Sequence, residues 1–360
     1  MFDLFGSVRA LLKVQTICID NNVFRLHYKA TVVMLVVFSL LVTSKQYFGD
    51  PIICLITKSA LRSNLIDSYC WVYSTFTVPR HLKEHREGLS GSPGVGSYVE
   101  GEDEVIYHKY YQWVCFVLFF QAILFYVPRY LWKLWEGGRL KLIALNLDSP
   151  LVSEVWTPER RKTVLEYLDS CGHHHNLYAF RFVVCETLNF INVVGQIFFL
   201  DVFLAGEFIH YGPKVLSRVP DGHDIDPMAR VFPKLAKCTF NYFGPSGTQQ
   251  VLDSLCMLPL NVVNEKVFVF LWFWLVLLSF LSFVALAYRL AVFVSPSLRS
   301  RLLLAQVRFM PRTTVALVVH AASPADWFFL RQLGKNLNPE VFKDILEHLA
   351  SRFVDKGSVA

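Results

Sequence analysis

Four polar side chains recur at helical spacing in an otherwise apolar stretch: Glu186, Asn189, Asn192 and Gln196. A carboxylate at the centre of a bilayer costs about 2.5–3.5 kcal/mol on insertion scales, so this polar stripe must face protein or water if the stretch crosses a membrane. Two interpretations stay open. The stripe forms hydrogen bonds between helices of one bundle, or it faces a subunit contact or a water-filled path.

Four of the eight cysteines lie in two polar segments of the chain. Cys54 and Cys70 lie in one polar segment, and Cys238 and Cys256 lie in another. This partition is expected of disulfides in two loops on the oxidising side of a membrane. Four cysteines allow three pairings, and their spacing does not choose among them. A metal site is the rival interpretation, but no CxxC motif or histidine cluster accompanies these cysteines, so no metal is predicted. The remaining cysteines fall in predicted cytosol or membrane: Cys18, Cys115, Cys171 and Cys185.

Three successive histidines, His173, His174 and His175, could bind a metal or titrate near neutral pH. Consecutive residues in a loop are poorly arranged for one coordination sphere, so a solvated loop is favoured. The sequence contains no P-loop, no GxGxxG after a strand, no GxSxG and no HExxH motif. It therefore offers no catalytic residues, and we expect neither enzymatic activity nor a cofactor.

The elements that carry these residues are predicted to be membrane helices. Hydrophobic residues make up 54% of the chain and charged residues 18%, a balance that is typical of a membrane protein. The clearest span has no charge between Trp113 and Val127 and is flanked by aromatic and basic residues of the kind that anchor helices at membrane interfaces. The prediction is an all-α membrane protein with a bundle of four transmembrane helices. The predicted segments are an N-terminal cytosolic or pore segment at 1–27, spans at 28–44, 110–131, 180–210 and 267–294, outer loops at 45–109 and 211–266, a cytosolic loop at 132–179 and a cytosolic helical tail at 295–360.

The distribution of positive charge predicts the orientation. Of the 35 Lys and Arg residues, 22 lie at 1–29, 129–182 and 289–360, which are the N-terminal segment, the middle loop and the tail together with the adjoining ends of the spans. Arg129 and Lys133 are among them, at the end of the second span. Because cytosolic segments carry the excess of positive charge, both termini and the middle loop are predicted to be cytosolic. The net charge of +6 then reflects this bias and an affinity for anionic lipid headgroups rather than nucleic-acid binding.

Helix-capping signals predict a folded cytosolic layer. A helix is expected to begin at Thr157-Pro158-Glu159, another at Ser323 with its end at Gly334, and a third at Asn338-Pro339-Glu340. The apolar faces of these helices have to be buried, so the middle loop and the tail should pack together. At the other end of the chain, residues 1–12 could form a helix on the membrane surface or inside a pore.

The segment Tyr110, Tyr111, Gln112, Trp113 and Val114 matches the YYQWV motif of the innexins, the invertebrate gap-junction proteins. Further segments at 19–30, 49–54, 69–79, 126–139, 226–247 and 255–274 are also similar to insect innexins of the commonest type. The virus-borne innexins of parasitoid wasps are similar too. The resemblance covers the chain from Met1 to beyond Gly334.

This resemblance implies a ring of eight subunits, a homo-oligomer or a mixture with other innexins, in the plasma membrane at cell–cell junctions. The outer loops, which would contain minor β structure, would be tied by disulfides Cys54–Cys256 and Cys70–Cys238. The ring would dock with the hemichannel of an adjacent cell and pass ions and small metabolites. The outer loops contain no Asn-x-Ser/Thr site, so no glycan would obstruct such docking. An undocked hemichannel and a non-conducting four-span adhesion protein are the alternatives.

The resemblance also favours the pore for the N-terminal segment. The implied pore-lining residues are Met1, Phe2, Asp3 and Phe5.

Overall fold

The computed structural model describes residues 17–55, 63–83, 94–97, 99, 101–145, 147, 152–170, 175–217, 227–307 and 310–357. Met1, Phe2, Asp3 and Phe5 lie outside these residues, as do Cys171, His173 and His174. The pore-lining assignment of the N-terminus therefore stays a prediction.

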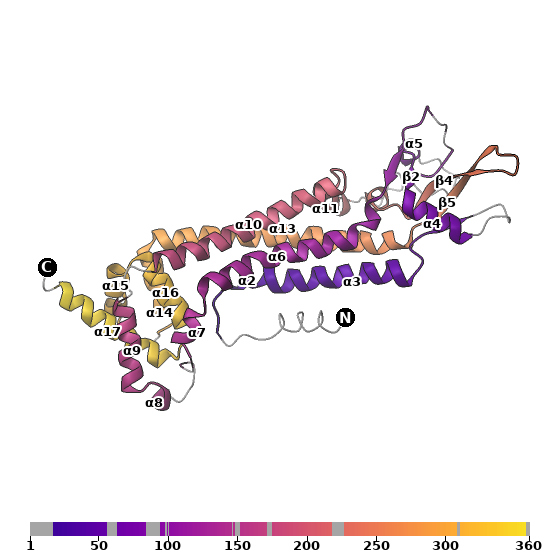
Figure 1. Cartoon of the computed structure of the whole chain (residues 1–360). Helices are drawn as coiled ribbons and strands as arrows, with labels where there is room; N and C mark the ends of the chain where they lie inside the picture. Colours follow the sequence, from indigo (N-terminus) through magenta and orange to yellow (C-terminus); the bar gives the residue numbers. More distant parts are fainter. Residues whose placement is uncertain are drawn as a thin grey trace. The chain divides into compact units, whose positions relative to one another are not determined.

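Four helices of the described chain are long and apolar enough to cross a membrane (Figure 1). The first is continuous through α2 (Asn22–Arg25), a π-helical turn η1 (Leu26–Thr31) and α3 (Val32–Phe48). The others are α6 (Val114–Glu136), α10 (Asn176–Phe203) and α13 (Pro259–Val294). Only 33–44% of the apolar window of each helix is buried inside the chain. The remaining surface carries large apolar side chains and must face lipid or another protein.

These helices differ in length from the predicted spans. The helix α10 ends at Phe203 because Ala205 and Gly206 adopt left-handed backbone angles, with φ values of 54° and 84°. A separate helix, α11 (Phe208–Leu216), follows. The helix α13 begins at Pro259, directly after a strand, so part of the predicted second outer loop is helical.

The described chain divides into two compact units. One unit comprises residues 32–123 and 193–277 and contains a five-stranded sheet in the order β1-β5-β4-β2-β3. All of its strand pairs are antiparallel. The strands are β1 (Ile53–Leu55), β2 (Thr75–Thr77), β3 (Ile106–His108), β4 (Leu235–Phe243) and β5 (Gln249–Met257). Short helices accompany the sheet: α4 (Ser63–Tyr73), α5 (Arg80–Lys83), η2 (Tyr110–Gln112) and α12 (Pro227–Val231).

The longest strands of this sheet form a hairpin. Its register runs from Leu235 opposite Met257 to Phe243 opposite Gln249. The connecting turn contains Gly247 at φ 77°, a left-handed conformation that glycine adopts without steric cost.

The other unit comprises residues up to 31 together with 124–192 and 278–360. Its short helices are α7 (Arg139–Ile143), α8 (Val152–Val155), α9 (Pro158–Ser170), α14 (Pro296–Leu304), α15 (Arg312–Ala321), α16 (Pro324–Gly334) and α17 (Pro339–Gly357). The three predicted helix starts are confirmed. Ser323 caps α16 by accepting a 3.1 Å hydrogen bond from the backbone N–H of Asp326, and Asn338 accepts one of 2.9 Å from that of Glu340.

The predicted packing of the middle loop against the tail is also confirmed. Side chains of α9 and α17 share one apolar core, which includes Leu165 and Ile345. Asp344 of α17 accepts hydrogen bonds from the indole Nε1 of Trp156 at 3.0 Å and from Nε of Arg161 at 2.6 Å. The bond from Arg161 is the main cause that lowers the pKa of the Asp344 carboxyl.

One sequence prediction is wrong for this unit. His175 was expected in a solvated loop, but only 7% of its surface is exposed. Its Nδ1 lies 2.8 Å from Oδ1 of Asp326, and its ring stacks on Phe329 with a centroid distance of 4.0 Å. The tail helix α16 thus provides the acidic partner and the aromatic surface that exclude water from this histidine.

Candidate functional site

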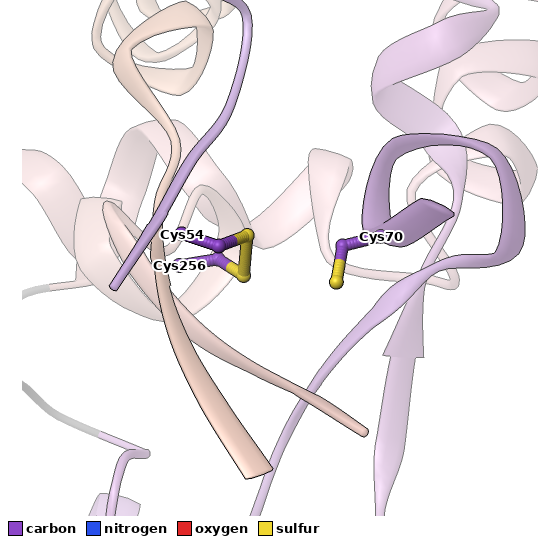
Figure 2. A group of neighbouring side chains, drawn as sticks. All are labelled: Cys54, Cys70 and Cys256. Atoms are coloured by element: carbon purple, nitrogen blue, oxygen red, sulfur yellow. A yellow bond between two sulfur atoms is a disulfide. The ribbon is translucent and has the colours of Figure 1, made fainter. Parts of the chain in front are cut away.

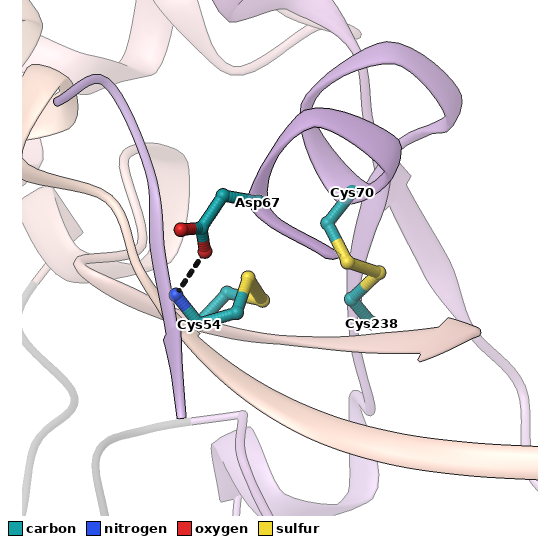
Figure 3. The surroundings of a disulfide bond; sticks show 5 residues. Cys54, Asp67, Cys70 and Cys238 are labelled. Atoms are coloured by element: carbon teal, nitrogen blue, oxygen red, sulfur yellow. Dashed lines mark hydrogen bonds between the residues drawn. A yellow bond between two sulfur atoms is a disulfide. The ribbon is translucent and has the colours of Figure 1, made fainter. Parts of the chain in front are cut away.

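Two disulfides join the segments that were predicted as outer loops. Cys54 on β1 lies directly opposite Cys256 on β5, and the two form one bridge. Cys70 on α4 is bonded to Cys238 on β4 (Figure 3). Each bridge therefore connects the first segment to the second, and neither bridge closes a loop within one segment. All four cysteines are at most 5% exposed.

The sulfur atoms of Cys54, Cys70 and Cys256 lie within 4.8 Å of one another. Figure 2 shows the Cys54–Cys256 bridge with the Cys70 sulfur beside it. Metal ions bind cysteine as the thiolate, and all three sulfurs here are part of disulfides. This cluster consequently has a structural function.

A carboxylate strengthens the link between α4 and β1. Oδ1 of Asp67 accepts a 2.7 Å hydrogen bond from the backbone N–H of Cys54 (Figure 3). The Cys70 bridge then attaches the same helix to β4. Helix, sheet and both bridges share one apolar cluster, which includes Ile66 and Tyr111, each with no exposed surface. The arrangement forms a rigid surface rather than two independent loops.

A buried histidine supports the far edge of the sheet. His108 on β3 is 7% exposed, and its Nε2 lies 2.8 Å from Oγ1 of Thr77 on β2. Burial lowers the pKa of His108 to about 4, so this side chain is neutral at physiological pH.

The polar stripe of α10 contributes to a buried ion pair. Oε1 and Oε2 of Glu186 accept hydrogen bonds from Nη2 and Nε of Arg289 on α13 at 2.7 and 2.8 Å. Asn21, the N-cap residue of α2, donates a further hydrogen bond of 2.5 Å to Oε1. The guanidinium also lies over the rings of Phe182 and Phe328 at 5.0 and 4.9 Å. Glu186 and Arg289 are only 6% and 8% exposed. Each would be costly to bury alone, and each neutralises the charge of the other.

The stripe divides between the two units. In the unit with the sheet, Oε1 of Gln196 accepts a 3.0 Å hydrogen bond from Nε2 of Gln121 on α6, and both side chains are buried. In the other unit, Oδ1 of Asn189 is buried without a hydrogen-bond partner among the described residues. Asn192 is partly buried. Glu186 and Gln196 therefore take part in contacts between helices of one subunit.

A second buried charge cluster was missed by the sequence analysis. The carboxylate of Asp20 pairs with Arg25 at 2.9 Å and with Arg129 of α6 at 3.1 Å, and it accepts a 2.8 Å hydrogen bond from the hydroxyl of Tyr28. Asp20 and Arg129 are 1% and 3% exposed. In the sequence, Arg129 is one of the positive charges that predict the orientation, and its pairing with Asp20 was not predicted. Arg289 was also missed, although a single arginine in an apolar run requires a partner and provided a signal in the sequence.

The family model described as Innexin matches residues 20–353, nearly the whole chain. This chain belongs to the innexin family. Innexin inx2 of Drosophila melanogaster is 57% identical over 356 residues, which cover 97% of this chain and 95% of that protein. Innexin inx2 of Schistocerca americana is 54% identical over 362 residues and the full length of both chains. Innexin shaking-B of Drosophila melanogaster is 42% identical over 355 residues, 98% of this chain and 95% of that protein.

Innexins are gap-junction channel proteins, and this innexin is accordingly a subunit of an oligomeric channel. Its four apolar helices are those of a multi-pass protein of the plasma membrane at cell junctions. The family is one of channels rather than enzymes.

The YYQWV segment of this innexin connects the disulfide-linked sheet to α6. The ring of Tyr111 lies 4.7 Å from that of Trp71, next to the Cys70 bridge. Nε2 of Gln112 donates a hydrogen bond to the backbone carbonyl of Trp71. Tyr110 meets Phe232 edge-to-face with a centroid distance of 5.5 Å. Val114 is fully buried, whereas Trp113 is 59% exposed and suited to an interface with lipid.

Proposed function

We propose that this innexin forms a ring of eight subunits that docks, through its two disulfide-linked outer segments, with a ring in an adjacent cell. The observation that carries the docking proposal is that both bridges join the two segments to one sheet. A docking surface repeated around a ring has to keep its shape in every copy, and bridges between segments limit the motion of one segment against the other. The absence of Asn-x-Ser/Thr sites in both segments supports close approach of a partner protein.

In the proposed orientation, both termini, the middle loop and the tail are cytosolic. The bias of Lys and Arg supports this orientation. The oxidised cysteines of the other two segments support it as well, because disulfides persist on the extracellular side. Ions and small metabolites pass along the ring axis between two cytoplasms. Other innexins can replace some copies in a mixed ring.

Recordings from paired and unpaired cells that express this chain test the proposal. We expect current between the two cells of a pair, which requires docking. Current across the membrane of unpaired cells alone would overturn docking and make the protein an undocked hemichannel that releases small molecules. The absence of both currents, with the protein present at the cell surface, would identify a non-conducting adhesion protein.

The proposed pore entrance consists of the N-terminal residues Met1, Phe2, Asp3 and Phe5. A ring repeats each side chain, so the copies of Asp3 would sum their charges and attract cations. Asp3→Lys is expected to reverse this preference and shift the reversal potential in a salt gradient toward the anion value. Asp3→Asn should produce an intermediate shift. An unchanged reversal potential for Asp3→Lys would contradict a pore-lining N-terminus.

A further inference from the structure

A groove of about 370 Å³ lies between the end of α13 and the helix α16, within a single unit of the chain. Its apolar wall is formed by the α13 residues Leu281, Val284 and Ala285. The other end of the groove carries Arg331 of α16 and Lys335, the C-cap residue of that helix. The remaining lining residues are Asn21, Asn22, Val23, Tyr288, Arg289, Phe328 and Gln332.

The guanidinium of Arg331 is held in place without a carboxylate. It lies 5.4 Å from the ring centroid of Trp327 and 5.9 Å from that of Tyr288, and it donates a 3.1 Å hydrogen bond to the Tyr288 hydroxyl. Its Nε is buried and has no hydrogen-bond partner among the described residues. The ring contacts fix the orientation of this cation and leave donor capacity unused.

Lys335 adds a second cation to the same end of the groove. Its Nζ donates a 2.9 Å hydrogen bond to Oε1 of Gln332, and no carboxylate of the described chain forms an ion pair with it. Desolvation is the main cause that lowers the pKa of Lys335, and the positive charges of Arg331 and Arg289 lower it further, against smaller opposing effects of Cys18 and Asp20. Arg289 is neutralised by Glu186. Arg331 and Lys335 therefore place two positive charges at one end of the groove, and no ion pair with a carboxylate is formed by either of them within the described part of the chain.

The apolar end of the groove belongs to a helix that is long and apolar enough to cross the bilayer. Val284 is 45% exposed and Tyr288 is 40% exposed, so this stretch of α13 is not covered within the subunit. One continuous groove thus runs from lipid-compatible side chains to two cations. A molecule with a phosphate and a hydrocarbon chain is complementary to both ends.

We propose that this groove binds an anionic phospholipid, with its phosphate at Arg331 and Lys335 and an acyl chain along Leu281 and Val284. A soluble phosphate ester would match the cations but would leave the apolar wall in contact with water. A neutral phospholipid would match the wall but would leave the positive charge of the two cations uncompensated.

The first experiment measures lipid retention. The full-length oligomer is purified from nanodiscs of phosphatidylcholine with or without phosphatidic acid, and the lipid that remains after detergent washing is quantified by mass spectrometry. Each basic side chain near an anionic lipid contributes about a fivefold factor in affinity. Arg331→Gln or Lys335→Gln should each reduce retained phosphatidic acid about fivefold, and the double variant about 30-fold. Retained phosphatidylcholine should not change.

The matched control is Arg301→Gln, which removes an exposed arginine of α14 that does not line the groove. This variant should retain phosphatidic acid as the original chain does. Equal losses in the control and the groove variants would show a general charge effect and overturn the proposal. Lys335 is exposed, so Lys335→Gln still gives a result if Arg331→Gln fails to fold.

The second experiment identifies what occupies the groove. A photoreactive benzoylphenylalanine in place of Tyr288 should form an adduct with the mass of phosphatidic acid upon irradiation. Lys335→Gln in the same chain should reduce this adduct. A crosslink to a second copy of the chain would overturn the proposal in favour of a subunit contact. Competition of glycerol 3-phosphate with phosphatidic acid at equal concentration would show that only a phosphate is bound and would overturn the acyl-chain assignment.

Discussion

Arg289→Ala is expected to destabilise the subunit by about 3–5 kcal/mol, because it leaves the carboxylate of Glu186 buried without its cation. Glu186 is 6% exposed, and both of its oxygens accept hydrogen bonds from the guanidinium. The hydrogen bond from Asn21 remains, but an amide does not neutralise a charge. We expect the variant to be retained inside the cell and to yield little assembled oligomer in fluorescence-detected size-exclusion chromatography.

Two further variants separate the ion pair from a general effect of mutation. Arg301→Ala removes an exposed arginine of α14 and should assemble normally. The double variant Glu186→Gln with Arg289→Gln removes both charges and should recover part of the assembly, because no uncompensated charge is left. If Arg289→Ala assembled as well as Arg301→Ala, the ion pair would not stabilise the fold.

Cys70→Ser is expected to abolish coupling between cells. The Cys70–Cys238 bridge connects α4 to β4 and closes a chain separation of 168 residues. Loss of such a bridge typically costs about 2–5 kcal/mol. The remaining thiol of Cys238, which is 1% exposed, would stay buried without its partner. Cys54→Ser should have a similar effect, because Cys54–Cys256 fixes β1 against β5. Junctional conductance in paired cells is the measurement.

The control for the disulfide prediction is Cys171→Ser in the middle loop, which should change conductance only slightly. Surface biotinylation should be recorded for every variant, so that loss of docking is distinguished from loss of folding. Equal loss of conductance in Cys70→Ser, Cys54→Ser and Cys171→Ser would contradict the prediction that docking depends on the four disulfide-bonded cysteines more than on Cys171. A normal conductance for Cys70→Ser would contradict a docking surface that depends on this bridge.

Much of this architecture could be predicted from the sequence because its signals are local. A run without charge between Trp113 and Val127 is sufficient to predict a span, because the composition of the run itself makes it compatible with a bilayer and no distant partner is needed. The caps at Ser323 and Asn338 involve backbone groups two or three residues away, so their hydrogen bonds are determined by neighbouring residues. The partition of cysteines between two outer segments is likewise visible along the chain.

The tertiary structure decided which distant residues meet. Spacing left three cysteine pairings open, and the resemblance to innexins, rather than geometry, indicated the pairing that β1, β4 and β5 bring about. Glu186 predicted a polar contact, but its partner lies 103 residues away on α13. His175 was predicted to be solvated because no residue near it in the sequence indicates its contacts with Asp326 and Phe329. Local hydrogen bonds and hydropathy determine where helices begin, end and cross the membrane. A buried charge needs an opposite charge and a disulfide needs a second cysteine, and only the packed chain brings these partners into contact.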